Sequence, residues 1–515
     1  MIKFLKNNLY IILLFAISLI VFVPTFNIKF SWIDDGWDIL VAKNLITDFT
    51  NLNFISIADK IVETNIGRFR PVYWLWQTVV YIIGESYSSI HYLLHYVLIF
   101  SVVFLVYKII YFFTKSNMSS FVGALILLIF PLNAENWIRL GPAEPIMIFF
   151  VLISFYIFFT KGDIKKSVFF IVLALLTKET VIAILPAFIL YYFLLLFTKK
   201  KVKNTFSYVM GILMLCSVSV LISMLNKKGY SNSYVFNILT AKYNFELYLR
   251  FIIQAFPAII LFIGTLLIRN IRPIVNFKFN KIKEFEISKF LFLMLALSFI
   301  LIQSPWAWVL NRYLLPAVAM GSIFIGLEFY SLNKKLRILV LIIISLFAIN
   351  AIVKINEQTV RQRHSTNNIY LMIKRVSEVT PKDGKVYFNF KDNDGTMEPL
   401  FESDLHLKLF FNRQDIKVDF IENLDSRESN YIVLSGTPLG SFKYTDDKDL
   451  VNDEKLKNFE TFNNESKFIV FSNYETIMKQ ISKKIFRSVY RREKIDSSGI
   501  YTNYLLKDSW SLYYY

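Results

Sequence analysis

Residues 9–38, LYIILLFAISLIVFVPTFNIKFSWIDDGWD, join an apolar run to a cluster of acidic residues. The first part, from about Leu9 to Val23, is predominantly apolar sequence of the kind that crosses a bilayer. The second part places Asp34, Asp35 and Asp38 shortly after that run. Charged side chains beside lipid are costly, and where they occur they usually serve a function. We therefore predict that a membrane-spanning helix ends in a functional loop at the membrane surface.

The rest of the chain repeats this alternation of apolar runs and polar loops. Of its 515 residues, 55% are hydrophobic and 17% are aromatic, and the mean hydropathy is +0.46. Charged residues make up 19% of the chain, whereas ordinary soluble domains carry about 25%. A soluble protein with so many apolar runs would have too little polar surface to face water. The sequence therefore predicts a polytopic α-helical membrane protein.

About eleven transmembrane helices are predicted from these runs. Loops assigned to the cytoplasmic side carry lysine or arginine, as the positive-inside rule expects, so the formal net charge of +18 does not indicate nucleic-acid binding. The start of the chain has a poor cleavage site after its apolar core, which favours an uncleaved first helix. The aromatic segment 71–83 is either an interfacial helix or the foot of the next span. The eleven runs cover approximately residues 9–23, 89–113, 119–132, 146–160, 168–176, 181–197, 208–225, 250–268, 290–303, 314–330 and 338–353.

An odd number of spans places the C-terminal region on the same, outer side of the membrane as the acidic loop. We predict a membrane module over residues 1–353, with an outer catalytic loop at 25–88, and a soluble extracytoplasmic domain over 354–515. In that last region, short strand-like runs such as KVYFNF (385–390) alternate with turn residues. This pattern favours a soluble α/β or mostly β domain.

Two neighbouring carboxylates, Asp34 and Asp35, are the strongest candidates for catalysis. A carboxylate near a low-dielectric surface can have the raised pKa that a general base needs at neutral pH. Its neighbour can then serve as a metal ligand or a hydrogen-bond partner. The alternative is structural, because Ser31 and Asp34 both suit the N-cap of a following helix.

Six further charged residues lie in outer loops or at the ends of predicted spans, and we regard them as candidates for substrate binding. Guanidinium groups suit bidentate contacts to phosphate, although arginines also anchor proteins to lipid headgroups or extend along a helix end to reach water. The helix dipole favours a carboxylate at a helix start, and a Lys–Glu pair near the membrane is either functional or a self-contained salt bridge. The six are Arg68 and Arg70 in GRFRP, Glu144 in AEPIMIFF, Lys178 and Glu179 in LLTKET, and Arg312 in NRYLLP.

Two histidines, His91 and His95, lie four residues apart in HYLLH. Two histidines at that spacing on a helix can bind a metal. No third ligand lies nearby in the sequence, so we interpret both as core or interface residues.

These motifs, taken in order, resemble the GT-C superfamily of membrane glycosyltransferases, close to its protein O-mannosyltransferase-like and aminoarabinose-transferase-like branch. The resemblance covers roughly residues 1–353, and it depends on the order and common sidedness of motifs that are each short. The matching motifs are SWIDDGWDILVAKNL after the first span, GRFRPVYWL before the second, WIRLGPAEPIMIFF at the fourth, LALLTKETVIAILP and NRYLLPA.

The resemblance implies an inverting, single-displacement transfer of a sugar from a polyprenyl-phosphate donor. It makes Asp34 the base that acts on the acceptor and Asp35 its partner. The family carries either an Asp-Glu or an Asp-Asp pair at this place, and here the pair is Asp-Asp. The superfamily includes metal-dependent and metal-independent members, so the expected cofactor is either none or a divalent metal, Mg²⁺ or Mn²⁺.

The resemblance also implies a site for the lipid phosphate. Arg68, Arg70, Lys178 and Arg312 become candidates for holding it. Glu144 matches the family's second acidic position, where Asp is common.

The sequence therefore predicts an integral membrane glycosyltransferase that transfers a hexosyl or pentosyl group. We expect it in a bacterial inner membrane, with the catalytic loop and the C-terminal domain outside the cytoplasm. The expected partners are a polyprenyl-phosphate sugar, an acceptor that is a glycan, lipid or protein, and membrane lipids, with no nucleic acid.

Two alternative functions stay open at this point. A polysaccharide polymerase or ligase also handles lipid-linked sugars, but its main outer loop usually comes late in the chain. A lipid-linked sugar flippase or transporter would place ionisable residues in the middle of helices, whereas most of those described above lie at predicted helix ends.

Overall fold

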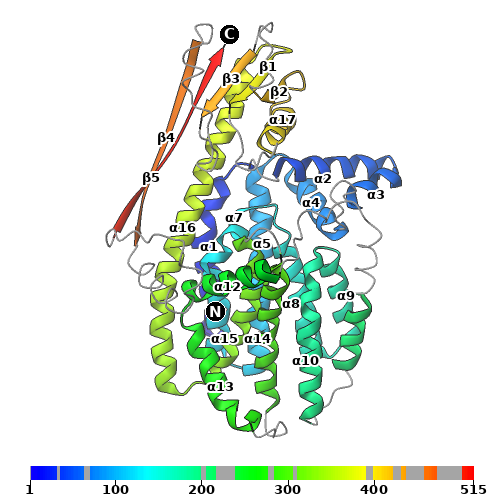
Figure 1. Cartoon of the computed structure of the whole chain (residues 1–515), viewed down its shortest axis with the longest axis vertical. Helices are drawn as coiled ribbons and strands as arrows, with labels where there is room; N and C mark the ends of the chain where they lie inside the picture. The colour runs from blue at the N-terminus through cyan, green and yellow to red at the C-terminus, as the bar shows by residue number, and fades with distance from the viewer. Residues whose placement is uncertain are drawn as a thin grey trace.

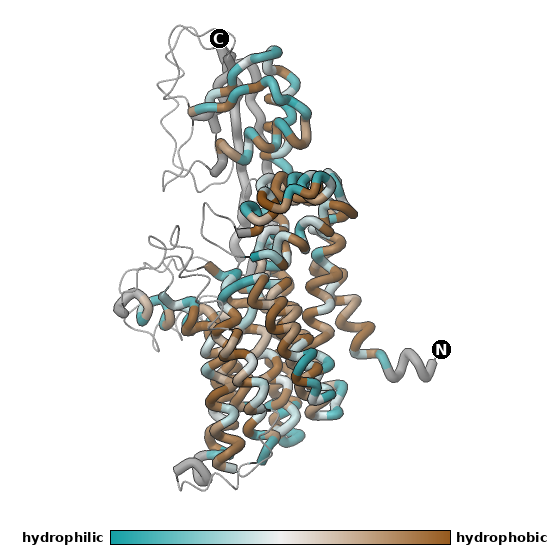
Figure 2. Tube along the Cα trace, turned by 90° about the vertical axis from the view of Figure 1, so that its right-hand side faces the viewer, coloured by the Kyte–Doolittle hydropathy of each residue, from teal (hydrophilic) through white to brown (hydrophobic). Residues whose placement is uncertain are grey.

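The chain forms a polytopic α-helical bundle, and a C-terminal helix and strands lie beyond one end of it (Figure 1). Hydrophobic residues run along the bundle, whereas hydrophilic residues gather at its ends and in the C-terminal region (Figure 2). This distribution is that of an integral membrane protein. The computed structural model describes residues 2–31, 35–62, 70–198, 205–215, 238–275, 283–305, 310–389, 398–420, 431–436, 457–471 and 501–514.

Within these ranges, seven straight helices are long and apolar enough to cross a membrane, and two bent helix pairs raise the number to nine if each pair is one span. The straight spans comprise α1 (Ile2–Phe22), α5 (Ser88–Thr114), α8 (Glu144–Lys161), the 3-10 turn Glu179–Ala183 with α10 (Ile184–Phe197), α14 (Glu284–Gln303), the 3-10 turn Asn311–Leu314 with α15 (Leu315–Ser331), and the first part of α16 (Lys334–Val379). The bent pairs are α6 (Asn117–Ile129) with α7 (Ala134–Ile138), and α12 (Ile238–Ala255) with α13 (Ile259–Val275).

These spans coincide with nine of the eleven runs predicted from the sequence. The run 168–176 corresponds to α9 (Ile164–Leu175), whose 12 residues are too few to cross a bilayer alone. The run 208–225 is described only in part, as the helix Thr205–Leu215. Its remaining residues lie outside the described ranges.

One predicted span, residues 250–268, is wrong as a single straight helix. α12 ends at Ala255 and α13 begins at Ile259, and the two helices are bent by 102° relative to each other. Pro257 lies in the break. Proline lacks a backbone N–H and disfavours a helical conformation of the residue before it, so the helix ends here although the apolar sequence continues.

The middle of the bundle is occupied by α15, in which every residue from Leu315 to Phe329 is buried. Glycines allow α15 and α6 to approach each other closely. A Cβ atom added to Gly123 would lie 2.7 Å from the carbonyl oxygen of Ser322, and one added to Gly326 would lie 3.0 Å from that of Ser119. Small residues at such contacts are typical of membrane helix packing.

A buried ion network joins α13, α14 and α15 at the end of the bundle away from the C-terminal region. Lys289 Nζ lies 2.7 Å from Glu286 Oε1 and 3.2 Å from Glu328 Oε2. Arg269 also pairs with Glu328. Because removal of one partner would leave a buried charge without compensation, this network fixes the relative positions of the three helices.

The helix α16 connects the membrane bundle to the C-terminal region without interruption. It has 46 residues and runs through position 353, where the sequence placed the domain boundary. Its last turns share a small apolar core with the following elements, in which Ile373, Val386 and Leu407 are completely buried.

The C-terminal elements form a mixed sheet with one helix beside it. The strand order is β2-β1-β3-β5-β4; β1 is parallel to β2 and to β3, whereas β5 is antiparallel to β3 and to β4. The elements are β1 (Lys385–Asn389), α17 (Glu398–Phe410), β2 (Lys417–Phe420), β3 (Tyr431–Gly436), β4 (Lys457–Phe471) and β5 (Tyr501–Tyr514).

Three helices that follow the first span lie between the bundle and this C-terminal region: α2 (Asp35–Thr50), α3 (Phe54–Val62) and α4 (Pro71–Gly84). α2 and α3 extend sideways at the end of the bundle that faces the sheet (Figure 1). Asp48 of α2 pairs with Lys60 of α3 and accepts a hydrogen bond from Ser56 Oγ at 2.7 Å. These contacts hold the pKa of Asp48 below its usual value. α2 packs against both α4 and α17, so its position depends on both parts of the chain.

Candidate active site

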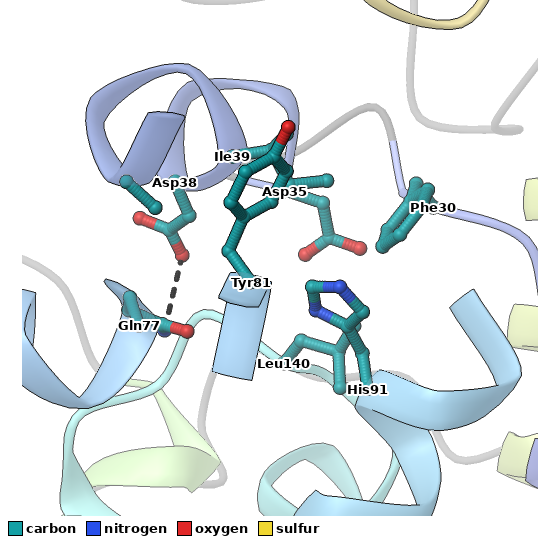
Figure 3. A pocket seen from close by; sticks show the side chains of 9 residues that line it. Phe30, Asp35, Asp38, Ile39, Gln77, Tyr81, His91 and Leu140 are labelled. Carbon is teal, nitrogen blue, oxygen red and sulfur yellow. Dashed lines mark hydrogen bonds between the residues drawn. The ribbon is translucent and has the colours of Figure 1, made fainter. Parts of the chain in front are cut away.

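A small acidic cleft lies between α2, α4 and the first turn of α5, and Figure 3 shows the side chains that line it. Its cavity volume is about 10 Å³, close to the minimum for one water molecule. Two of its lining residues, Asp35 and Asp38, are buried aspartates. The lining residues are Phe30, Asp35, Asp38, Ile39, Ala42, Gln77, Tyr81, His91 and Leu140.

Asp35 is the first residue of α2, and its side chain is buried. Its Oδ2 atom accepts a hydrogen bond from the backbone N–H of Ser31 at 2.7 Å. A carboxylate in the first turn of a helix is also favoured by the helix dipole. The carboxylate points into the cleft and faces the ring of His91 (Figure 3). Asp35 therefore ties Ser31 to the start of α2 and presents a carboxyl group to the cleft.

Asp38 lies one helical turn further on and is held by side chains of α4. Tyr73 donates its hydroxyl to Asp38 Oδ2 at 2.8 Å, and Gln77 Nε2 lies 3.4 Å from the same oxygen. The Tyr73 hydroxyl is also 2.8 Å from the carbonyl oxygen of Gly141. These contacts hold the Asp38 side chain in place against α4.

The two histidines of HYLLH, His91 and His95, contact different backbone carbonyl oxygens. His91 Nε2 is 3.0 Å from the carbonyl oxygen of Glu85, whereas His95 Nε2 is 2.8 Å from that of Asn136. Both are buried. The prediction that they are core or interface residues is confirmed, and His91 also forms one wall of the acidic cleft.

Four of the predicted substrate-binding residues form two ion pairs near the cleft. Lys178 pairs with Glu144 at the start of α8, and neither side chain is more than 8% exposed. Arg70 pairs with Glu179, its Nη2 atom lying 3.2 Å and 3.4 Å from the two carboxylate oxygens. A buried ion pair stabilises a protein only if its geometry is good. In both pairs here, the carboxylate is in direct contact with its cation.

Arg312 joins the same group of charges through α7. Its Nη1 atom lies 3.6 Å from Glu135 Oε1, which also pairs with Arg139 at 2.9 Å. Asn136 donates to the backbone carbonyl of Arg312 at 2.9 Å. Arg312 is also close enough to Glu144 for a Coulombic interaction. Two arginines share one glutamate here, so the group as a whole holds four cations and three carboxylates.

The acidic cleft and this group of cations are joined by short segments. The backbone N–H of Val72, at the start of α4, donates to the carbonyl oxygen of Leu176 at 3.1 Å, two residues before Lys178. The segment between Arg139 and Glu144 supplies Leu140 to the cleft wall and the Gly141 carbonyl to Tyr73. The structure thus brings Asp35, Arg70, Glu144, Lys178, Glu179 and Arg312 to one end of the bundle.

Two of the predicted site residues, Asp34 and Arg68, lie outside the described residues. The sequence analysis assigned no role to Asp38, Tyr73 or Gln77. Their spacing contains a usable signal, because residues three or four apart lie on one face of a helix. Asp35, Asp38 and Ala42 follow this spacing on α2, and Tyr73, Gln77 and Tyr81 follow it on α4.

A Mg²⁺ or Mn²⁺ ion, which the resemblance allows, needs a cluster of suitable ligands. Hard cations of this kind prefer several carboxylate or carbonyl oxygens. Among the described residues, no group of three or more His, Cys, Asp or Glu side chains could hold a metal ion. Asp38 is already engaged by Tyr73 and Gln77.

Comparison with known proteins does not assign the chain to a family. No protein-family model matches the sequence, and no curated protein matches it significantly. What is established is an integral, polytopic α-helical membrane protein with an acidic cleft and a group of ion pairs at one end.

Proposed function

We propose that this protein is a GT-C-type glycosyltransferase that moves a sugar from a polyprenyl-phosphate donor to a glycan, lipid or protein acceptor outside the cytoplasm. One observation carries the proposal: the buried carboxyl groups of Asp35 and Asp38 lie at the same end of the membrane bundle as the ion-paired cations Arg70 and Lys178. A hydroxyl acceptor needs a base, a phosphate leaving group needs positive charge, and a polyprenyl chain needs apolar helices. This end of the bundle offers all three.

In the proposed reaction, the Asp34 carboxylate takes the proton of the acceptor hydroxyl while the acceptor oxygen attacks the anomeric carbon of the sugar. The bond between that carbon and the phosphate oxygen breaks with inversion, and its electron pair leaves with polyprenyl phosphate. General-base assistance of this kind contributes roughly 10²–10⁴-fold. Asp35, the neighbour of the base in sequence, accepts a hydrogen bond from the Ser31 N–H and ties that residue to the start of α2.

The phosphate gains negative charge as the bond to the sugar breaks. We assign the stabilisation of this charge to Lys178, Arg70 and Arg312. Each of these cations is held by a carboxylate of the bundle, so it does not need to reorganise when the charge develops. Preorganised charges in a site with little water are the most effective means of stabilising such a transition state.

The buried charges of the bundle favour this proposal over a transporter. A transport pathway would place ionisable groups in the middle of the spans. The buried pairs described above lie at helix ends instead: Lys178 and Glu144 at the outer end, and Lys289 and Glu328 at the opposite end. This arrangement suits a reaction at the membrane surface.

The proposal is tested by a transfer assay on the purified, detergent-solubilised protein. Wild type, Asp34→Asn and Asp59→Asn are incubated with polyprenyl-phosphate sugars and a cell-envelope extract, and release of polyprenyl phosphate is measured. Asp59 is an exposed acid on α3 of the same outer loop, which makes it a matched control. We expect Asp34→Asn to lose transfer by roughly 10²-fold or more, while Asp59→Asn keeps it.

Two results would count against the proposal. Transfer by Asp34→Asn at the wild-type rate would remove Asp34 as the base. Absence of transfer by the folded wild type with every donor of the panel would remove the activity itself. A product that grows by many sugar units would instead support the polymerase alternative.

A further inference from the structure

The C-terminal helix α17 places a buried carboxylate on the N-terminus of α2. Glu402 Oε2 accepts a hydrogen bond from the backbone N–H of Gly36 at 3.0 Å, and Glu402 Oε1 accepts one from the backbone N–H of Trp37 at 3.2 Å. Glu402 is 1% exposed. The first N–H groups of a helix have no partner within the helix, and an anion there also interacts favourably with the helix dipole. Glu402 thus supplies, from 366 residues away in sequence, the cap of the helix that begins at Asp35.

Gly36 makes this approach possible. A Cβ atom added to Gly36 would lie 2.2 Å from Glu402 Oε2 and 3.3 Å from His406 Cδ2. Glycine within a helix costs roughly 0.5–1 kcal/mol relative to alanine, so its presence in the first turn needs a reason. The reason here is that any larger residue would displace the Glu402 carboxylate.

The aromatic wall of the cleft continues into α17. The ring of Phe30 stacks on that of Phe410, with centroids 4.9 Å apart and planes 9° apart. The rings of Phe30 and His91 are perpendicular, with their centroids 5.1 Å apart. Phe30 and His91 both line the acidic cleft. The C-terminal region therefore contacts the cleft through side chains as well as through the α2 backbone.

The segment that precedes the acidic residues is held by α16. Asn367 Oδ1 accepts the N–H of Lys29 at 2.9 Å, and its Nδ2 donates to the carbonyl oxygen of Asn27 at 3.1 Å. Contacts from the C-terminal part of the chain thus lie on both sides of residues 32–34: Asn367 holds the chain before them, and Glu402 holds it after them.

The two contact helices are fixed to each other. Arg413, just after α17, donates to the carbonyl oxygens of Thr380 and Pro381 at 3.0 Å each, immediately after α16 ends. Its guanidinium also pairs with Asp415 at 2.8 Å. Because α16 is continuous with the membrane bundle, α17 has a defined position relative to the spans and can set the position of α2.

We propose that Glu402 is a positioning residue of the active site: it anchors the N-terminus of α2 and thereby sets the place of Asp35 and Asp38. The C-terminal region is then a working part of the catalytic site. Its effect on turnover depends on the proposed glycosyl transfer, but the anchoring of α2 does not. Small displacements of reacting groups, on the order of 1 Å, can lower the rate about 10²-fold. Loss of the anchor should therefore lower the turnover rate.

The anchor is tested on the full-length protein with Glu402→Ala, the milder Glu402→Gln and the control Asp404→Asn. Asp404 lies on the same helix and pairs with Lys408 at a partly exposed position. Amide hydrogen exchange is followed in peptides that cover the start of α2. Loss of hydrogen bonds to a buried carboxylate should raise the exchange rate of Gly36 and Trp37 roughly ten- to hundredfold in Glu402→Ala, less in Glu402→Gln, and not in Asp404→Asn.

Kinetics distinguish a positioning role from general support of the fold. In Glu402→Ala we expect kcat to fall roughly ten- to hundredfold while the KM for the donor changes little, since the cations of the bundle are untouched. Gly36→Ala should produce the same loss, because it displaces the same carboxylate. The double variant Gly36→Ala/Glu402→Ala should then be no slower than either single variant.

Two outcomes would overturn the inference, and a third would separate it from the proposed function. Unchanged exchange at the start of α2 in Glu402→Ala would show that the carboxylate does not anchor the helix. Multiplied losses in the double variant would show that the two residues act independently. Faster exchange in a protein whose wild type transfers no sugar would leave the anchor standing and remove only the proposed function.

Discussion

Lys178 and Glu144 form a buried ion pair between residues 34 positions apart in sequence, and Lys178 Nζ also lies 4.6 Å from the centre of the Tyr313 ring. Glu144 begins α8, Lys178 precedes the turn into α10, and Tyr313 precedes α15. The pair is therefore the point at which three membrane spans meet beside the acidic cleft.

The pair should contribute to stability and to activity by separable means. Lys178→Met leaves Glu144 as a buried charge without its main partner, which should destabilise the protein by roughly 3–5 kcal/mol. The double variant Lys178→Met/Glu144→Leu removes both charges and should recover most of the lost melting temperature. It should not recover sugar transfer, because the cation that stabilises the phosphate is gone. Thermal unfolding in detergent and the transfer assay measure the two effects; restored transfer in the double variant would show that Lys178 has no chemical role.

The Tyr73 hydroxyl should matter for the acidic cleft more than for the fold. Tyr73→Phe removes the 2.8 Å hydrogen bond to Asp38 Oδ2 and keeps the packing of the ring. A hydrogen bond to a charged group is worth roughly 1.5–3 kcal/mol, so we expect turnover to fall about ten- to hundredfold. Tyr81→Phe, one cleft residue further along α4, has no hydroxyl contact to Asp38 among the described hydrogen bonds and serves as the control. Equal losses in both variants would contradict a special role for Tyr73.

The sequence alone predicted the membrane architecture well, because hydropathy measures what a bilayer selects. It identified the ends of α5, α8 and α15 to within two residues, whereas α14 begins six residues before the predicted run. It did not show that Pro257 bends one span by 102°, since bends depend on how the freed backbone groups are satisfied by neighbours. Nor did it show α16 continuing past residue 353, because its polar second half carries no membrane signal.

The charged residues of the candidate site were predictable where they stood out against an apolar background. Lys178 and Glu144 were identified for this reason. Asp38 was visible but received no role, because its donors Tyr73 and Gln77 come from another helix. The Glu402 contact with Gly36 spans 366 positions, and nothing in the local pattern of FESDLHLK distinguishes that glutamate from a solvated one.

Acid should weaken the contact between the C-terminal region and the outer loop through His406. This residue is completely buried on α17, 4.0 Å from Glu402, and burial lowers its pKa to about 4. In the unfolded chain a histidine titrates near 6.5. The contribution of neutral His406 to stability is therefore fully present above about pH 6.5 and is lost as the pH falls toward 4, because only the unfolded state binds the proton in that window.

This loss amounts to about 3 kcal/mol at most. Melting temperatures of wild type and His406→Gln are compared in detergent at about pH 7.5 and about pH 4.5, on either side of most of this window. We expect the wild type to lose more of its melting temperature on acidification than the variant. If both proteins lose the same amount, His406 does not carry the acid sensitivity.

Donor binding tests the central claim most directly, because it does not depend on knowing the acceptor. Wild type and Asp34→Asn are purified in detergent and incubated with a panel of polyprenyl-phosphate sugars, and the melting temperature of each mixture is measured. A ligand that binds only the folded state raises the melting temperature by mass action. At a ligand concentration a hundredfold above Kd, the folded state is stabilised by about 2.7 kcal/mol. We predict that one donor of the panel stabilises both proteins, since Asp34 acts on the acceptor and the cations that hold the phosphate are intact. Failure of every donor to stabilise the well-folded wild type would contradict a glycosyltransferase that uses lipid-linked sugars.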